Sequence, residues 1–178
     1  MSKRFYIIAL LCAGMAISQY AFSTNLWTNS KNRIGAMFPS SPEMHEAVTS
    51  GGTGIAYQSN KRFNEGASLF AITIVPMDKN KLKNGTDVFL KAANSSFIES
   101  MGSDPKKATI NWTKFGDGRS KLNYDFIFDY SGFKLKGKGY WIYDKNRAIR
   151  VSVAYMTTLK SVDIKETVAF LDTFILVK

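Results

Sequence analysis

The stretch from residue 119 to residue 156 constrains the fold more strongly than any other part of the chain. Between Ser120 and Tyr130, the even positions from residue 122 onward carry leucine or an aromatic residue, whereas the odd positions are polar or charged except at Ile127. Because successive side chains of a strand point to opposite faces, this alternation predicts a long strand with one buried and one solvent-facing side. Ser131 and Gly132 then predict a two-residue hairpin turn.

That turn predicts a hairpin of residues 119–130 with residues 133–143, since pairing Tyr130 with Phe133 sets the register. In this register Gly137 lies opposite Phe126, and Gly139 lies opposite Tyr124. Each glycine can thus be covered by an aromatic ring on the neighbouring strand. On the outer face, three pairs of opposite charge face one another: Asp129 and Lys134, Asp125 and Lys138, Arg119 and Asp144. A slip of one residue would separate all three pairs, so the charges support this register.

A third strand should continue the meander after residue 146. Its apolar residues all occupy odd positions: Ile149, Val151, Val153 and Tyr155. If they share the buried face with Trp141, the connection must hold an odd number of residues, which predicts a three-residue loop over 144–146 with Asn146 at positive φ. Arg150 would then lie on the outer face, across from Tyr140, in cation–π contact.

The rest of the chain predicts short strands and two helices. The expected strands cover residues 33–38, 44–49, 55–59, 68–75 and 108–115, and residues 50–54 are expected to form a turn or mobile loop. Apolar residues at helical spacing predict one helix over residues 86–101 and a second over residues 162–173. These elements predict an α+β domain: an antiparallel sheet with a long meander and helices packed on it.

The first residues have the pattern of a secretory signal. Lys3 and Arg4 precede residues 5–17, an uncharged and mostly apolar run of 13 residues. This length suits a signal peptide, because a membrane span needs roughly 20 apolar residues. Small residues at the −3 and −1 positions predict cleavage after Ser23, with an uncleaved anchor as the alternative. The expected organisation is a signal peptide over 1–23 and one domain over 24–178.

Export is consistent with the cysteine content and leaves a basic protein. Cys12 is the only cysteine and lies in the expected leader, so the processed chain could form no internal disulfide, which fits a bacterial periplasm. The protein is therefore expected to be periplasmic or secreted. Removing Lys3 and Arg4 lowers the net charge from +10 to +8. The remaining positive charge favours binding to an acidic partner or an anionic surface. The alternative is that the charge serves solubility alone.

A basic row on the outer face is the predicted interaction patch. It consists of Lys121, Lys134, Lys136, Lys138 and Arg150. The expected partner is a protein of the cell envelope or an anionic surface, with peripheral membrane contact as a further option. The alternative is an ordinary solvated strand face. Nucleic acid is not expected, because export separates the protein from it and the outer face has few aromatic residues for stacking.

Residue types needed for catalysis are scarce. His45 is the one histidine, and without a second histidine or a cysteine in the processed chain, thiolate and multi-histidine metal sites are excluded. Asp125 and Asp129 would lie about 13 Å apart on one strand, beyond the roughly 5–9.5 Å of glycosidase pairs. Residues 51–54 are glycine-rich, but a strand follows them, not a phosphate-binding helix. No enzyme, cofactor or metal site is therefore predicted.

The order of motifs resembles the PsbP-like superfamily. The resemblance rests on Phe38-Pro39-Ser40-Ser41-Pro42, a central helix, a glycine-bearing meander, and a final helix running into residues 172–176. It implies an α/β/α sandwich over nearly all of the domain. Members are typically extracytoplasmic accessory proteins of membrane complexes, and the family has no catalytic residue to carry over.

Three functional hypotheses follow. The first is an exported, non-catalytic accessory or binding protein of the bacterial cell envelope that contacts a membrane-associated complex. The second is a carrier of a small apolar or lipid-like ligand, held in a pocket lined by Tyr124, Phe126, Phe128 and Trp141. The third is a hydrolase that uses His45.

Overall fold

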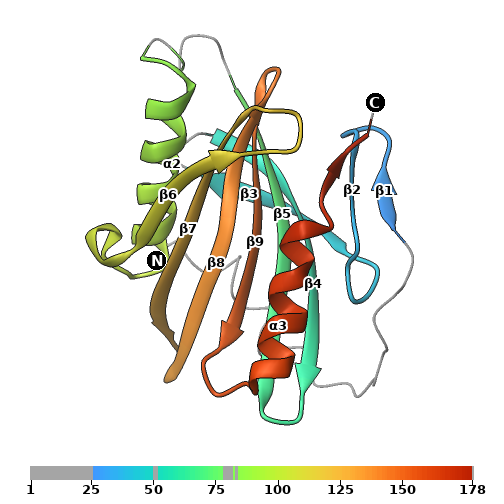
Figure 1. The fold of residues 1–178 in the computed structure, drawn as a ribbon, viewed down its shortest axis with the longest axis vertical. Helices are drawn as coiled ribbons and strands as arrows, with labels where there is room; N and C mark the ends of the chain where they lie inside the picture. Colours follow the sequence, from blue (N-terminus) through green and yellow to red (C-terminus); the bar gives the residue numbers. More distant parts are fainter. Residues whose placement is uncertain (1–25, 50–51, 78–81, 83, 178) are drawn as a thin grey trace.

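The protein has an α+β fold built on a seven-stranded antiparallel sheet with the order β3-β4-β5-β9-β8-β7-β6 (Figure 1). The computed structural model describes residues 26–49, 52–77, 82 and 84–177, so the expected leader and its cleavage site lie outside the described residues. The elements are β1 (Trp27–Asn29), β2 (Ile34–Ala36), β3 (Glu43–Thr49), β4 (Gly52–Phe63), β5 (Gly66–Pro76), α2 (Thr86–Ser100), η3 (Pro105–Lys107), β6 (Thr109–Lys114), β7 (Ser120–Tyr130), β8 (Phe133–Asp144), β9 (Arg147–Met156), α3 (Ser161–Ala169), η4 (Phe170–Asp172) and β10 (Ile175–Leu176).

Helices α2 and α3 cover opposite faces of this sheet. On one face, α2 packs over β7 and β8, with a core that includes Leu90, Ile98, Leu122, Phe126 and Trp141. On the other face, α3 and a small sheet of order β1-β2-β10 pack over β4, β5 and β9, with a core that includes Phe38, Phe70, Ile142, Val151 and Phe170. The strands at the centre of the sheet are therefore buried on both sides.

The predicted β7–β8 hairpin is confirmed in its register. Tyr130 pairs with Phe133, Phe126 with Gly137, and Tyr124 with Gly139. Ser131 and Gly132 form the turn with φ angles of 48° and 82°, the positive values that a type I′ hairpin turn requires.

Of the three predicted charge pairs, the structure forms an ion pair at Arg119 and Asp144, pairs Asp125 with a different lysine, and places Asp129 and Lys134 as cross-strand neighbours. Arg119 Nη1 lies 2.7 Å from Asp144 Oδ1, as the register implies. Asp125, however, makes its ion pair with Lys136, at 3.0 Å, although Lys138 is its direct cross-strand neighbour. Diagonal neighbours on one face of a sheet lie within reach of a long side chain. Asp125 can therefore pair either with Lys138 directly across or with Lys136 on the diagonal.

Replacing Ser131 by asparagine should stabilise the protein by roughly 0.5 kcal/mol, because asparagine tolerates the left-handed conformation of this turn better than serine. Urea unfolding of the purified variant measures the effect. Ser161→Asn is a matched control, because Ser161 is an exposed serine outside the positive-φ positions. Equal changes in the free energy of unfolding of the two variants would show that the conformation of the turn is not the cause of the stabilisation.

The predicted three-residue loop before β9 is wrong. Asp144 pairs with Arg147, so Lys145 and Asn146 form a two-residue turn, and Lys145, with φ of 57°, takes the left-handed position. This connection places Arg150 opposite Trp141 on the α2 side. The odd-numbered apolar residues of β9 face α3 instead. The prediction assumed a sheet with one buried face, whereas β9 is buried on both.

The expected loop over residues 50–54 is also wrong where the structure describes it. Residues 50 and 51 lie outside the described part, but Gly52 begins β4 and Gly54 is buried within it. A Cβ atom on Gly54 would lie 2.2 Å from the carbonyl oxygen of Ile74, so the glycine allows β4 and β5 to approach closely here.

Candidate binding groove

Four residues of the predicted patch lie on one face of the sheet, and the fifth lies on the opposite face. Lys134, Lys136 and Lys138 follow one another along β8 and share a face with Lys121 of β7. This is the part of the α3 face that α3 itself leaves uncovered. Arg150 lies on the opposite face and is only 5% exposed, because the two-residue turn before β9 reverses which side its even positions face. The predicted patch was therefore wrong at Arg150.

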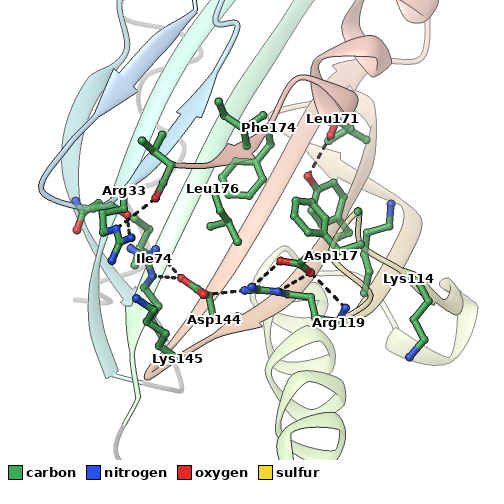
Figure 2. A pocket seen from close by; sticks show the side chains of 18 of the residues that line it. Arg33, Ile74, Lys114, Asp117, Arg119, Asp144, Lys145, Leu171, Phe174 and Leu176 are labelled. Atoms are coloured by element: carbon green, nitrogen blue, oxygen red, sulfur yellow. Dashed lines mark hydrogen bonds and ion pairs between the residues drawn. The ribbon is translucent and has the colours of Figure 1, made fainter.

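A groove of about 1030 Å³ opens beside this face, between the small sheet and the end of the large sheet that carries the β8–β9 turn (Figure 2). We refer to it as the groove. Its apolar lining includes Ile74, Phe115, Tyr140, Leu171, Phe174 and Leu176. Figure 2 shows Arg33 at one side and Lys114 at the other, with Phe174 and Leu176 between them.

Four charged side chains form a chain of ion pairs along the groove, which we call the clamp: Asp117, Arg119, Asp144 and Arg147. Arg119 lies 2.6 Å from Asp117 through Nη2 and 2.7 Å from Asp144 through Nη1. Arg147 Nη2 donates to the other oxygen of Asp144 at 2.7 Å, and its Nη1 donates to the carbonyl of Asn32. The clamp thus ties the β6–β7 loop, the β8–β9 turn and the β1–β2 loop together.

The clamp keeps its charges at neutral pH. Burial alone would raise the pKa of Asp144, but hydrogen bonds from Arg119 and Arg147 and the two positive charges outweigh it, so the pKa lies below its usual value. Burial would lower the pKa of Arg119, yet its hydrogen bonds to Asp144 and Asp117 raise it. Since these four side chains pair with one another, the clamp stabilises the wall of the groove and leaves ligand binding to the other charged residues.

The remaining charges make the groove basic. Among the described residues that line it, six are arginine or lysine and three are aspartate. Outside the clamp, the cations are Arg33, Lys114, Lys121 and Lys145, against the single acid Asp172. Lys121 lies over the ring of Tyr140, with Nζ 4.8 Å from the ring centroid, while Lys114 and Lys145 are exposed.

A second hollow of about 390 Å³ extends the groove along the edge of α3. The two hollows share Lys121, Tyr140, Leu171 and Asp172, and the second reaches Lys138. The predicted lysine row therefore adjoins the groove at Lys138. Within that row, Lys136 is paired with Asp125, and this hydrogen bond raises its pKa.

The residues considered for catalysis do not gather in the groove. His45 lies on the edge strand β3, where Nε2 is 3.5 Å from Glu43. Asp125 and Asp129 stay on one strand, and Asp125 is engaged by Lys136. In the described ranges, no group of three or more His, Cys, Asp or Glu side chains could hold a metal ion.

No family model matches this chain, and neither does any curated protein. None of the helices in the described part is long and apolar enough to cross a membrane. The groove and the surface around it are therefore the main guides to function.

Sequence reasoning identified Lys121 and the Arg119–Asp144 pair but missed most of the groove. Arg33, Lys114, Lys145 and Phe174 come from four separate loops or strand ends, so no local spacing relates them. The one usable signal was the Arg119–Asp144 pair itself, since it predicted that the start of β7 and the end of β8 meet.

Proposed function

We propose that this is an exported, non-catalytic binding protein of the bacterial cell envelope, which holds an acidic segment of a membrane-associated partner protein in the groove. The observation that carries the proposal is a large groove that combines an apolar lining with an excess of cations. The resemblance to the PsbP-like superfamily supports it, because members of that superfamily typically serve membrane complexes.

An extended acidic peptide suits this groove better than a compact metabolite. Small-molecule pockets are commonly about 300–1000 Å³ and mostly enclosed by apolar side chains. Here a volume of about 1030 Å³ continues into a second hollow. Apolar side chains of a peptide would bury against Phe174 and Leu176, and its carboxylates would meet Lys114, Lys121 and Lys145. Lys114 and Lys145 are exposed to solvent, so salt should weaken the complex.

Reversing the three groove lysines, Lys114, Lys121 and Lys145, to glutamate should weaken partner binding by about tenfold or more, because each attraction becomes a repulsion. A photo-crosslinking amino acid at Ile175 can report the contact in living cells, since Ile175 lines the groove and is 41% exposed. Mass spectrometry of the crosslinked product identifies the partner. We expect one acidic envelope protein to be captured by the wild type and lost in the triple variant.

The matched control reverses Lys91, Lys106 and Lys107, which are exposed on α2 and η3 and change the net charge equally. Capture should survive in this control. Equal loss in both triple variants would show a general charge effect, and binding of anionic lipid vesicles without protein capture would indicate a membrane surface; either result contradicts the proposal. The predicted row Lys134, Lys136 and Lys138 stays a prediction, and its reversal tests whether the contact extends along β8.

A further inference from the structure

A buried arginine lies on the other face of the sheet, beneath α2. Arg150 is 5% exposed, and its guanidinium carbon lies 3.7 Å from the ring centroid of Phe97 and 5.4 Å from that of Trp141. Its Nη2 donates to Thr73 Oγ1 at 3.0 Å. Burial lowers the pKa of Arg150, but a guanidinium remains charged at neutral pH.

No carboxylate of the described residues makes an ion pair with this arginine. Its Nε is buried and has no hydrogen-bond partner among them. Buried arginines are nearly always paired, because removing an uncompensated charge from water costs several kcal/mol. The two rings and Thr73 offset part of this cost, but they supply no negative charge.

Two small cavities adjoin the guanidinium. Their volumes are about 110 and 40 Å³, and Arg150, Gln58 and Phe97 line both. Around them, three side-chain atoms are buried without a partner in the described part of the chain: Arg150 Nε, Trp141 Nε1 and Gln58 Oε1. Burial raises the pKa of Tyr124 to about 12, so its hydroxyl remains a donor. The two unpartnered N–H donors, Arg150 Nε and Trp141 Nε1, thus outnumber the one unpartnered acceptor, Gln58 Oε1, which favours an anionic oxygen ligand.

The larger cavity, which we call the α2 cavity, has apolar walls and reaches the surface. Its lining includes Ala47, Val75, Phe89 and Ala93. It also includes Val48, which is 72% exposed, and the exposed Ser100, so it opens between β3 and the C-terminal half of α2. A dry cavity of about 150 Å³ can hold benzene, and the α2 cavity, at about 110 Å³ and open at one end, suits a carboxylate with a short apolar tail.

We propose that the α2 cavity binds an apolar monocarboxylic acid, with its carboxylate against Arg150 and Trp141 and its tail along the apolar walls toward Val48. This site lies on the face opposite the groove and does not depend on the function proposed for the groove. It gives a specific chemistry to the hypothesis of a carrier for a small apolar ligand.

Titration of the purified protein with straight-chain acids from acetate to octanoate tests the site. A ligand that binds only the folded state raises the melting temperature with its concentration. We expect affinity to rise with chain length, as more apolar surface is buried. Octanol, which matches octanoate without the charge, should bind at least tenfold more weakly. The proposal is overturned if no acid raises the melting temperature, or if octanol binds as tightly as octanoate.

Arg150→Met removes the charge while keeping an unbranched side chain. We expect octanoate affinity to fall at least tenfold while the unliganded variant stays folded, because a buried unpaired charge is lost. Gln58→Glu keeps the shape of the side chain and supplies an internal carboxylate beside the cavities, so it should raise the melting temperature and block octanoate. The triple variant of the groove lysines should bind octanoate as the wild type does.

Unchanged octanoate affinity in Arg150→Met would refute the site. If that variant does not fold, Gln58→Glu decides: wild-type octanoate affinity in Gln58→Glu refutes the proposal, and loss of binding with raised stability supports it. Loss of octanoate binding in the groove triple variant would place the ligand in the groove and also overturn the assignment.

Discussion

Replacing Gly139 by alanine should destabilise the protein by about 3 kcal/mol or more, since overpacking against a fixed backbone has no easy relief. A Cβ atom at this position would lie 2.3 Å from the carbonyl oxygen of Val151 and 2.9 Å from the Cα of Ser152. Both belong to the backbone of β9, which cannot retreat without losing its pairing with β8. Valine at Gly139 should destabilise further. Tyr124 Oη, at 2.7 Å, adds to the crowding.

Gly137→Ala is the matched control, two residues away on the same strand and face. There the three nearest atoms to a Cβ atom would all belong to the ring of Phe126, the closest being Cε1 at 2.7 Å, and a side chain can shift more readily than a paired strand backbone. We expect a cost of about 1 kcal/mol for this variant. Urea unfolding at pH 7 compares the two. Similar losses for both would mean that the backbone of β9 is not the obstacle.

Asp144→Asn should have the second largest effect, a loss of about 3 kcal/mol at pH 7, because it leaves two arginines without their shared carboxylate. The side chain of Asp144 is 9% exposed and contacts Arg119 and Arg147 at 2.7 Å each. Asp117→Asn removes the other acid of the clamp, but that side chain is 44% exposed. Exposed pairs contribute little, so we expect less than about 1 kcal/mol for it.

The effect of Asp144→Asn should depend on pH. The pKa of Asp144 is lowered in the folded protein, so its stabilisation is fully present above the unfolded pKa of about 3.9 and is lost as pH falls through the folded value. The difference between wild type and variant should therefore be constant from pH 7 to about pH 5 and shrink below pH 4. Urea midpoints across this range measure it. A difference that persists unchanged in acid would show that charge is not the cause.

The β7–β8 hairpin could be predicted from the sequence because all the information it needs is local. Its strands are joined by Ser131 and Gly132, and a two-residue turn allows one register. Within that register, the aromatic residues, the glycines and the charges agree on both faces. The helix over residues 86–100 was equally local, since its apolar spacing needs no partner to be recognised.

The position of β9 could not be obtained in the same way. Ile149, Val151 and the later odd positions show which residues share a face, but not which face that is. The β1–β2 region, which lies far earlier in the chain, and α3, which follows β9, cover the second side of the sheet, and only their packing makes both faces buried. Arg150 was misplaced for this reason, and with it the cavity beneath α2.

The groove depends on tertiary structure even more strongly. Arg33, Lys114, Lys145 and Phe174 lie in segments separated by about 30 to 80 residues, and each is unremarkable in its own segment. The chain by itself therefore determined strands, turns and the hairpin register, because alternation and turn geometry act between neighbouring residues. Which faces are covered, which charges meet and where the hollows open were decided only by packing between distant segments.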